Sequence, residues 1–505
     1  MPTGPVWWTG AAWATGTLLA LAAGAWRRID VLASRATLGR RPGQLRGSRP
    51  RAWARARDLT ELAVRHQEPG RFTLGRLGRT LLASDPESHV ALIAPTRSGK
   101  TTRYVIPWLL EHNGPAVVTS TRTDVVAATR SWRARKGNVI VWDPFGADSV
   151  HWTPLTGCED WAFALAQAQW LADAAEEGDS DIARFWRGEA ARLLAPLLHA
   201  GAHAQTPIAH VLSWIDTQNI EEPGNVLTTN RSTAALRQLE GIARLDPRNR
   251  GTIFMSAAAL LAAYRHPAVQ ATATDGLTPT DLLDEPNTLY IVASARQQRL
   301  LAPLVVAILS SILHAAAERA NAAGPLKPTL RVLLDETANI APIRDLPAHL
   351  SQAAGHGVRI ATIWQTLAQA HHRYSHAADE ILANSTTKLY LGPITDDTTR
   401  RNISNLLGEQ PTDVISIQAD SQRRSHTTNR VWRPKGAPAT LQQLADDEAL
   451  MIAGRLPPAV IRTEPWWSST KMRLHASAAP AHAARTPTAE RSRLSGNDPE
   501  GDRSA

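Results

Sequence analysis

The sequence feature that most constrains the fold is a short polar turn between two apolar stretches, in residues 89–110, HVALIAPTRSGKTTRYVIPWLL. The first stretch has the length and composition of a buried strand, and the second has helical periodicity. The turn places Gly99, Lys100 and Thr101 where the strand ends and the helix begins, which is the context that a phosphate-binding loop requires. A strand–loop–helix unit of this kind favours an α/β fold with a parallel sheet.

Lys100 stands out because the chain otherwise avoids lysine, with only six lysines among 55 basic residues. In a phosphate-binding loop, backbone N–H groups hold the phosphates, a lysine reaches the terminal phosphates as a compact cation, and a threonine hydroxyl coordinates Mg²⁺. A broad, planar guanidinium does not replace that ammonium. The predicted nucleotide-binding residues are Pro95, Thr96, Arg97, Ser98, Gly99, Lys100, Thr101 and Thr102, with Thr101 also binding the metal.

The loop departs from the pattern G-x-x-x-x-G-K-[ST] at one position, because its first glycine is Ala94 here. Alanine favours φ below zero, so we expect the loop to begin in an ordinary extended conformation. A surface turn that binds nothing is the alternative interpretation of so short a motif.

Two acids end a second apolar stretch, LRVLLDE, at residues 330–336. In P-loop enzymes an acid at this place holds Mg²⁺ through water, and the carboxylate next to it can activate the attacking water. We therefore predict that Asp335 binds the metal and that Glu336 is catalytic. Acids also end many strands as solvated caps, so the order of the two motifs, loop first and acids later, is stronger evidence than either motif alone.

Gln365 ends a third apolar stretch, VRIATIWQ, at residues 358–365. If this strand adjoins the strand of Asp335, the amide can sense the terminal phosphate; otherwise Gln365 is a polar residue that caps a helix. With this residue, the predicted catalytic set is Lys100, Glu336 and Gln365.

Strand-like runs lie on both sides of a middle region that is rich in alanine and leucine. Strands are expected at 89–94, 115–120, 138–143, 288–294, 330–336, 358–365 and 387–393. The middle region has long helical periodicity and predicts an all-helical insertion. We predict a nucleotide-binding domain in two parts, residues 80–158 and 276–474, an all-α domain at 159–275, and a disordered tail at 475–505.

The N-terminal residues 5–26 carry no charge, and as a helix they would span roughly 33 Å, enough to cross a bilayer. Tryptophans lie near both ends, and Arg27 and Arg28 follow, so we expect a single-pass anchor at 1–26 with the bulk of the chain in the cytoplasm. A cleaved signal peptide and a soluble apolar helix are the alternatives. A signal peptide carries positive charge before its apolar core, and MPTG has none.

Basic residues dominate the next segment, residues 27–79, which holds 14 arginines against four acids. This composition predicts a connector that lies against anionic lipid, with nucleic-acid binding as the alternative.

Other chemistries have little support in this sequence. Cys158 is the sole cysteine, which excludes an intramolecular disulfide and any zinc site with several cysteines. His371 and His372 lack carboxylates at metal-ligand spacing, and no G-x-S-x-G motif is present.

The motifs, their order and the helical insertion together resemble the type IV secretion coupling proteins, the TraG/TraD-like conjugative DNA-transfer ATPases. The resemblance extends over roughly residues 80–465. Its most specific parts are APTRSGKTTRYVIP, VVTSTRTDV, VIVWDPFG, RFWRGEAARLL, LLDETANIAP, IWQTLAQ and NSTTKLYLGPITDDTT.

This resemblance implies a RecA-like P-loop NTPase with a parallel-sheet core, an inserted all-α domain that faces incoming substrate, an N-terminal membrane anchor and a homo-hexameric ring. It implies ATP and Mg²⁺ as cofactors, and ATP-driven delivery of relaxase-bound, single-stranded DNA to the proteins of a type IV secretion channel at the cytoplasmic membrane. Lys100 and Thr101 would bind nucleotide and metal, Asp335 and Glu336 would serve Mg²⁺ and water, and Gln365 would sense phosphate.

The chain departs from the family pattern in two places. Many members have two membrane helices, whereas this sequence shows one. Many also carry an arginine finger shortly before the sensor strand, where this chain has Gly355-His356-Gly357, and a histidine is a poor substitute for a permanent cation. Arg359, Arg400 and Arg401 are candidates for that role.

Two other functions stay open at this point. One is a double-stranded DNA translocase of the FtsK/HerA type, which shares the RecA-like core; the long helical insertion and the short anchor favour a coupling protein instead. The other is a membrane receptor that recruits a partner without hydrolysing nucleotide. Such a receptor would be expected to lose the carboxylates, and both are present.

Overall fold

The computed structural model describes residues 53–174, 181–420, 423–435 and 441–477. The predicted anchor at 1–26, the connector up to residue 52 and residues 478–505 of the predicted tail lie outside these described residues. The tail prediction is wrong at its start, because the last described helix runs from Thr470 to Ala476.

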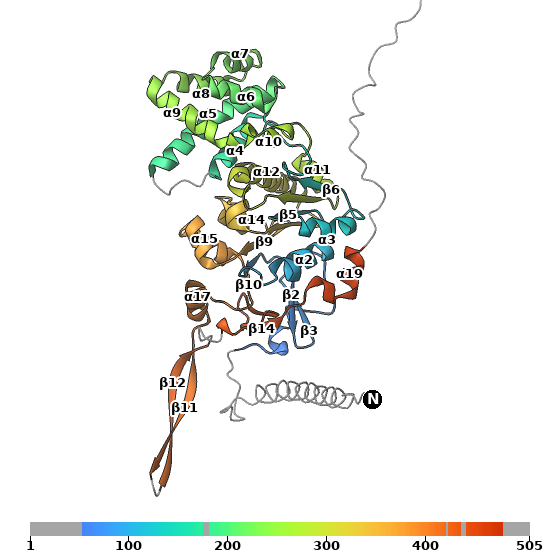
Figure 1. Ribbon diagram of the computed structural model, residues 1–505, viewed down its shortest axis with the longest axis vertical. Coiled ribbons are helices and arrows are strands. Elements are labelled where there is room, and N and C mark those ends of the chain that lie inside the picture. The colour runs from blue at the N-terminus through green and yellow to red at the C-terminus, as the bar shows by residue number, and fades with distance from the viewer. Residues whose placement is uncertain (1–52, 175–180, 421–422, 436–440, 478–505) are drawn as a thin grey trace, which may run out of the picture. The chain divides into compact units, whose positions relative to one another are not determined.

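A mixed sheet of twelve strands, counted within the described residues, forms the core of the fold (Figure 1). Its parallel part has the order β10 (Thr387–Leu391), β4 (Val90–Ile93), β9 (Val358–Trp364), β8 (Leu330–Leu334), β5 (Ala116–Ser120), β7 (Thr288–Val292) and β6 (Val139–Trp142). All seven strands predicted from the sequence are confirmed. β4, β5, β7, β8 and β9 are buried along their whole length, as expected for strands that are covered on both faces.

Alternate residues of these strands belong to two hydrophobic cores, one on each face of the sheet. Val90 and Leu92 of β4 pack with the core of α2 (Ile106–Glu111) and α3 (Asp124–Arg133), whereas Ala91 and Ile93 pack with the core of α12 (Gln298–Ala323). The second face also carries α13 (Thr337–Ile340), α14 (Leu346–Gln352), α15 (Leu367–Tyr374) and α16 (Ala377–Asn384).

Among the described residues, α12 is the one helix that is long and apolar enough to cross a membrane. Its most apolar window is 72% buried within the protein, so α12 is packed as a helix of the core.

The fold begins before residue 80, so the predicted lipid-facing connector is wrong for its last part. Residues 53–79 contribute η1 (Ala56–Leu59), β1 (Ala63–Val64) and β2 (Thr73–Leu77), and β3 (Thr80–Ala83) follows. The reason is a short alternating pattern that the arginine content masks: Phe72 and Leu74 are buried, while Thr73 and Gly75 next to them are only partly buried.

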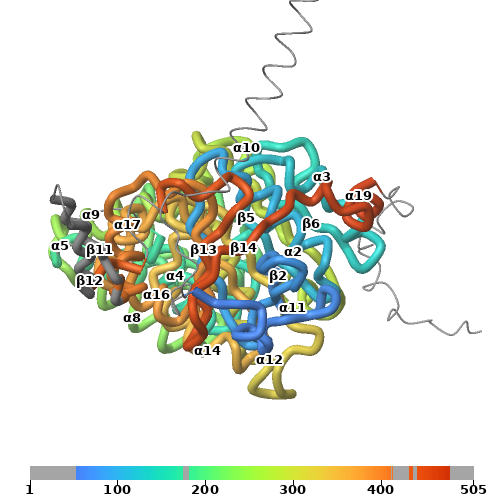
Figure 2. The backbone as a smooth tube through the Cα atoms, turned by 90° about the horizontal axis from the view of Figure 1, so that it is seen from below, coloured from blue at the N-terminus to red at the C-terminus, as the bar shows by residue number. Residues whose placement is uncertain are grey.

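These strands join the parallel sheet through an antiparallel extension near the C-terminus. β13 (Glu448–Ala453) pairs with β10, β14 (Ala459–Arg462) pairs with β13, and β2 pairs with β14. The chain then ends its described part in α19 (Thr470–Ala476), which contacts α3 and α2 (Figure 2).

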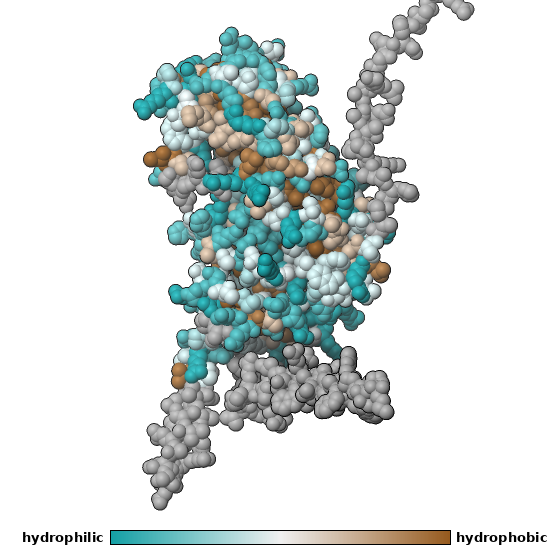
Figure 3. Space-filling model, in the orientation of Figure 1, coloured by the Kyte–Doolittle hydropathy of each residue, from teal (hydrophilic) through white to brown (hydrophobic). Residues whose placement is uncertain are grey.

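Every element in the described part of residues 159–275 is a helix, so the helical character predicted there is confirmed, while the domain boundaries themselves stay predictions. The elements are α4 (Trp161–Asp173), α5 (Asp181–His203), α6 (Ile208–Asp216), α7 (Glu221–Thr229), α8 (Thr233–Ala243), α9 (Pro247–Leu260), η3 (Ala262–Arg265) and α10 (Pro267–Ala271); α11 (Pro279–Asp284) follows before β7. α4 packs against α5 and α12. The visible surface is mostly hydrophilic with small hydrophobic areas (Figure 3), and Ile182 and Phe185 on α5 are among the exposed apolar residues.

A separate two-stranded hairpin follows α17 (Asp397–Leu407). It consists of β11 (Glu409–Asp420) and β12 (Arg423–Pro434), paired antiparallel with each other (Figure 1).

Candidate functional site

The predicted phosphate loop lies between β4 and a π-helical turn, η2 (Thr101–Val105), that continues into α2. Ala94 extends the strand, because its N–H donates to the carbonyl oxygen of Trp364 at 2.9 Å, as expected for a loop that begins without the first glycine. Positive φ occurs later in the loop, at Arg97 (65°) and Gly99 (86°). The Ser98 hydroxyl donates to the Pro95 carbonyl at 2.7 Å and closes the turn.

Lys100 lies between the two predicted acids. Its Nζ is 3.4 Å from Asp335 Oδ1 and donates a hydrogen bond to Glu336 Oε1. The Thr101 hydroxyl donates to Asp335 Oδ2 at 3.4 Å. The Lys100 side chain is 14% exposed and that of Asp335 is 4% exposed, so this contact is shielded from water. The predicted proximity of the loop and the acids is confirmed.

Sheet topology explains why these residues meet. β9 lies between β4 and β8, and all three strands are parallel, so their C-terminal ends share one edge of the sheet. The loop follows β4, the acids follow β8 and Gln365 follows β9. Ligands of open α/β sheets bind at such an edge.

Gln365 completes the cluster by contacting one of the acids. Its Nε2 donates to both carboxylate oxygens of Glu336 at 2.9 Å. The strand of Gln365 adjoins that of Asp335, which is the condition set for a role at the phosphate.

The pKa values in the site follow from burial and from the close charges. Burial alone would lower the pKa of Lys100, but the carboxylates of Asp335 and Glu336 outweigh it, and the pKa is raised above its usual value. Burial raises the pKa of Asp335; Lys100 opposes that shift, and the neighbouring charge of Glu336 adds to it. Asp335 therefore depends on a nearby cation to stay ionised.

These residues also fit a magnesium ion. The buried Oδ1 of Asp335 has only the 3.4 Å ion pair with Lys100 and no well-formed hydrogen bond, and carboxylate and hydroxyl oxygens are ligands that Mg²⁺ prefers. No group of three or more His, Cys, Asp or Glu side chains in the described residues could hold a metal ion by itself. That agrees with a site where one or two protein oxygens act together with nucleotide phosphates.

The backbone of Glu336 is left-handed, with φ 60° and ψ 50°. A residue other than glycine costs about 1–3 kcal/mol in such a conformation, and it persists only where the surroundings fix it. The sequence contained no signal for this strain, since glutamate is not a residue that favours positive φ.

Sequence reasoning also missed two buried hydroxyls that contact this edge of the sheet. The Thr119 hydroxyl on β5 donates to the carbonyl oxygen of Asp335 at 2.8 Å. Thr337, directly after Glu336, contacts both β8 and β9. Threonine is common in strands, so neither residue is conspicuous in the sequence.

One of the three candidate finger arginines is excluded by its contacts. Arg359 is 7% exposed, and its guanidinium donates to the carbonyl oxygens of Pro86, Ala354 and Val358 of the same chain. A side chain committed to its own backbone does not reach a neighbouring subunit.

The other two candidates lie on α17. Arg400 is largely buried and donates to Gln442 Oε1 at 2.8 Å and to Asp397 Oδ1 at 3.2 Å. The side chain of Arg401 is 76% exposed and pairs with the other oxygen of Asp397.

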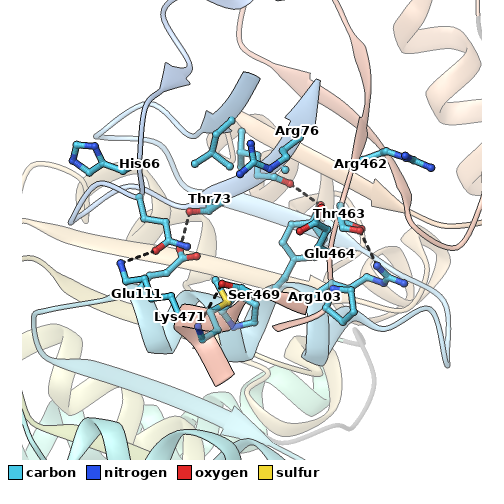
Figure 4. A pocket seen from close by; sticks show the side chains of 18 of the residues that line it. His66, Thr73, Arg76, Arg103, Glu111, Arg462, Thr463, Glu464, Ser469 and Lys471 are labelled. Carbon is cyan, nitrogen blue, oxygen red and sulfur yellow. Dashed lines mark hydrogen bonds between the residues drawn. The ribbon is translucent and has the colours of Figure 1, made fainter. Parts of the chain in front are cut away.

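A cavity of about 450 Å³ lies beside the loop, between α2, β2 and residues 462–472 (Figure 4). Arg103, the residue directly after the loop, lines this cavity, and its guanidinium donates to the Thr463 carbonyl at 2.8 Å. At another part of the cavity, Glu111 accepts a hydrogen bond from the Thr73 hydroxyl at 2.7 Å, and burial raises the pKa of Glu111 to about 7. The cavity is next to the phosphate loop and does not include its residues 95–101.

The loop, the acids and the sheet order define a RecA-like P-loop nucleotide-binding fold. A family model described as type IV secretory system conjugative DNA transfer matches residues 51–489, and the chain belongs to this family.

Two curated relatives are similar in sequence, both conjugal transfer proteins TraG from Escherichia coli. One is 27% identical over 413 residues, which cover 74% of this chain and 62% of the relative; the other is 26% identical over 404 residues, which cover 72% and 62%. The chain thus spans less than two thirds of the length of these relatives.

Solved structures of the conjugative coupling protein TrwB share the fold. The trigonal form of TrwBdeltaN70 with sulphate has a TM-score of 0.63 at 17% identity and covers 84% of this chain and 97% of that one. TrwB in complex with ADP and Mg²⁺ has a TM-score of 0.62 at 17% identity and covers 84% and 96%.

Proposed function

We propose that this chain is a membrane-anchored ATPase that couples DNA, or a DNA–protein conjugate, to a type IV secretion channel and drives its transfer by ATP hydrolysis. The observation that carries the proposal is the position of Lys100 between Asp335 and Glu336, with Gln365 on the same carboxylate. Membership of the conjugative DNA transfer family supports the substrate. TrwB, solved with ADP and Mg²⁺ and with an ATP analogue, supports ATP and Mg²⁺ as cofactors.

Each residue has a distinct part in the proposed site. The N–H groups of the loop and of the helix after it bind the phosphates, and Lys100 exchanges its contacts with the acids for contacts with the terminal phosphates. Thr101 and Asp335 supply the oxygens for Mg²⁺, which when bound neutralises charge on the phosphates. Glu336, held by two hydrogen bonds from Gln365, orients the attacking water and accepts its proton.

The assembly and the partners belong to the same proposal. We propose a homo-hexamer whose partners are single-stranded, relaxase-bound DNA, the relaxase and the channel proteins, with the all-α domain at 159–275 facing the substrate. Arg401 is proposed to reach the nucleotide of the neighbouring subunit, since its exposed ion pair with Asp397 is worth little and is easily given up. Arg401→Ala is then expected to lower turnover only at concentrations at which rings form; an equal loss in monomers would contradict the role.

The test is ATP hydrolysis by the full-length protein with and without DNA. Lys100→Ala and Glu336→Gln are expected to abolish turnover, and only the former to weaken nucleotide binding. Lys471→Ala, which changes an exposed lysine on α19, is the matched control and keeps wild-type turnover. Wild-type turnover in both site variants would refute the assignment.

The same assay separates the two other functions. Stimulation by duplex DNA but not by single strands would favour a double-stranded DNA translocase of the FtsK/HerA type. Nucleotide binding by wild-type protein without turnover, under all DNA conditions, would favour a recruitment receptor.

The membrane location is proposed from the uncharged N-terminal stretch and is tested by fractionation. We propose that the chain is single-pass, with its bulk in the cytoplasm. The full-length protein should stay with membranes in high salt, because a spanning helix is held by burial of apolar surface. Release by salt alone would reduce the attachment to electrostatic association.

A further inference from the structure

We propose that Thr337 is a positioning residue for hydrolysis, whose hydroxyl keeps Glu336 and Gln365 at hydrogen-bonding distance from each other. This inference rests on the proposed ATPase function and adds a residue that acts through its neighbours.

Thr337 joins the ends of two strands through one atom. It is the first residue of α13 and is fully buried, at 0% exposure. Its Oγ1 donates to the carbonyl oxygen of Leu334 at 2.8 Å and accepts from the N–H of Ile363 at 3.0 Å. Leu334 is the last residue of β8, and Ile363 lies on β9.

The hydroxyl lies at the last step of the ladder between the two strands. That ladder ends at the pair Leu334–Thr362, after which the chain leaves β8. The N–H of Ile363, one residue further on β9, donates to the Thr337 hydroxyl, which in turn donates to the carbonyl of Leu334. Thr337 thereby adds a side-chain bridge between the two strand ends.

The two residues that this contact holds are those that prepare the water. Glu336 directly precedes Thr337 and has a left-handed backbone, which persists only where the surroundings fix it. Gln365 comes two residues after Ile363, and its Nε2 is 2.9 Å from both oxygens of Glu336. A shift of either strand end changes those distances directly, whereas neither hydrogen bond of the Thr337 hydroxyl goes to the phosphate loop that follows β4.

The expected signature is a loss of turnover with little change in nucleotide binding. Thr337→Val keeps the shape of the side chain and removes the hydroxyl, and with it the hydrogen bonds to Leu334 and Ile363. We expect kcat to fall at least tenfold while Kd for ATP changes less than threefold. Thr337→Ser restores the hydroxyl and should keep kcat within threefold of wild type.

A matched control separates this effect from a general loss of stability. Thr129 on α3 is equally buried, and its hydroxyl donates to the Val125 carbonyl at 2.7 Å and lies 2.6 Å from the Tyr290 hydroxyl, outside the proposed site. Thr129→Val should lower the melting temperature in the same way as Thr337→Val and leave kcat within twofold of wild type.

The experiment uses full-length protein and two measurements, steady-state hydrolysis and amide hydrogen exchange of the peptide over residues 358–365. Thr337→Val should speed exchange there, and Thr337→Ser should not. Wild-type kcat in Thr337→Val, an equal fall in Thr129→Val, or unchanged exchange would overturn the inference. Absence of turnover in the wild-type protein would instead refute the ATPase function, and exchange would still show whether Thr337 holds β9.

Discussion

Lys100→Ala tests the physical basis of the site without any nucleotide. The change removes the ammonium that contacts both Asp335 and Glu336 and leaves two adjacent, shielded carboxylates without that cation. We expect the nucleotide-free protein to become less stable, whereas removal of a solvated surface lysine would change its stability little.

The magnitude follows from the burial of the cluster. Removal of one partner from a buried ion pair costs about 3–5 kcal/mol. Protonation of Asp335, whose pKa burial already raises, limits the cost, so we expect about 3 kcal/mol near pH 8. With an unfolding entropy of about 2.1 cal/mol/K per residue over roughly 400 folded residues, the melting temperature should fall by about 3–4 °C.

The pH dependence has a definite sign. The folded-state pKa of Lys100 is raised above its unfolded value, so its contribution to stability is present throughout the neutral range and is lost only at pH values above the unfolded lysine pKa. In Lys100→Ala the folded pKa of Asp335 rises further, so the variant loses stability as pH rises from about 4 upward. The difference from wild type should therefore be largest at pH 8 and small at pH 5.

The assay is thermal unfolding in EDTA without nucleotide, from pH 5 to pH 8. Lys100→Ala combined with Glu336→Gln should recover part of the loss, because one unpaired charge is removed. If Lys100→Ala is as stable as wild type at pH 8, or loses as much at pH 5 as at pH 8, then the lysine is not what keeps Asp335 ionised.

Three further changes test other parts of the fold. Burial raises the pKa of Glu111 to about 7, so its buried carboxylate opposes folding increasingly as pH rises from about 4.5 to 7. Urea unfolding of Glu111→Gln should show a gain of about 2 kcal/mol over wild type at pH 8 and no gain at pH 4.5. If the variant and wild type are equally stable at both pH values, the raised pKa is contradicted. Gly75 has a φ of 145°, and a Cβ added there lies 2.6 Å from the carbonyl oxygen of Arg462. Gly75→Ala should therefore lower the free energy of unfolding by at least about 2 kcal/mol. A loss under about 0.5 kcal/mol would show that β2 and β14 can separate freely. Asp160 caps the N-terminus of α4, where its side chain accepts a hydrogen bond from the N–H of Phe163 at 2.8 Å. Asp160→Ala should lower the free energy of unfolding by about 1 kcal/mol, and Asp160→Asn by much less. Similar losses in both variants would contradict the capping role.

The parallel core could be predicted because its strands are apolar runs of strand length between turn residues. Such strands are buried on both faces, so VALI at 90–93 and LRVLL at 330–334 contain almost nothing but apolar residues. The antiparallel extension was missed because β2, TLGRL, includes a glycine and an arginine and is only partly buried. Its place in the sheet depends on β14, almost 400 residues later in the chain, and local patterns carry no information about that pairing.

That the candidate site residues lie together could be predicted, but the distances between them could not. The loop and the acids are recognised by residue type and by the strand that precedes each, and once β4, β9 and β8 are neighbours, Lys100, Asp335 and Gln365 must meet at one edge. What fixes the distances within that edge is different chemistry. The left-handed backbone at Glu336 and the contacts of the Thr337 hydroxyl with Leu334 and Ile363 exist only in the folded sheet. A sequence motif can therefore identify the acid that is proposed to receive the proton, whereas its proposed alignment by Thr337 lies outside any nucleotide-binding motif.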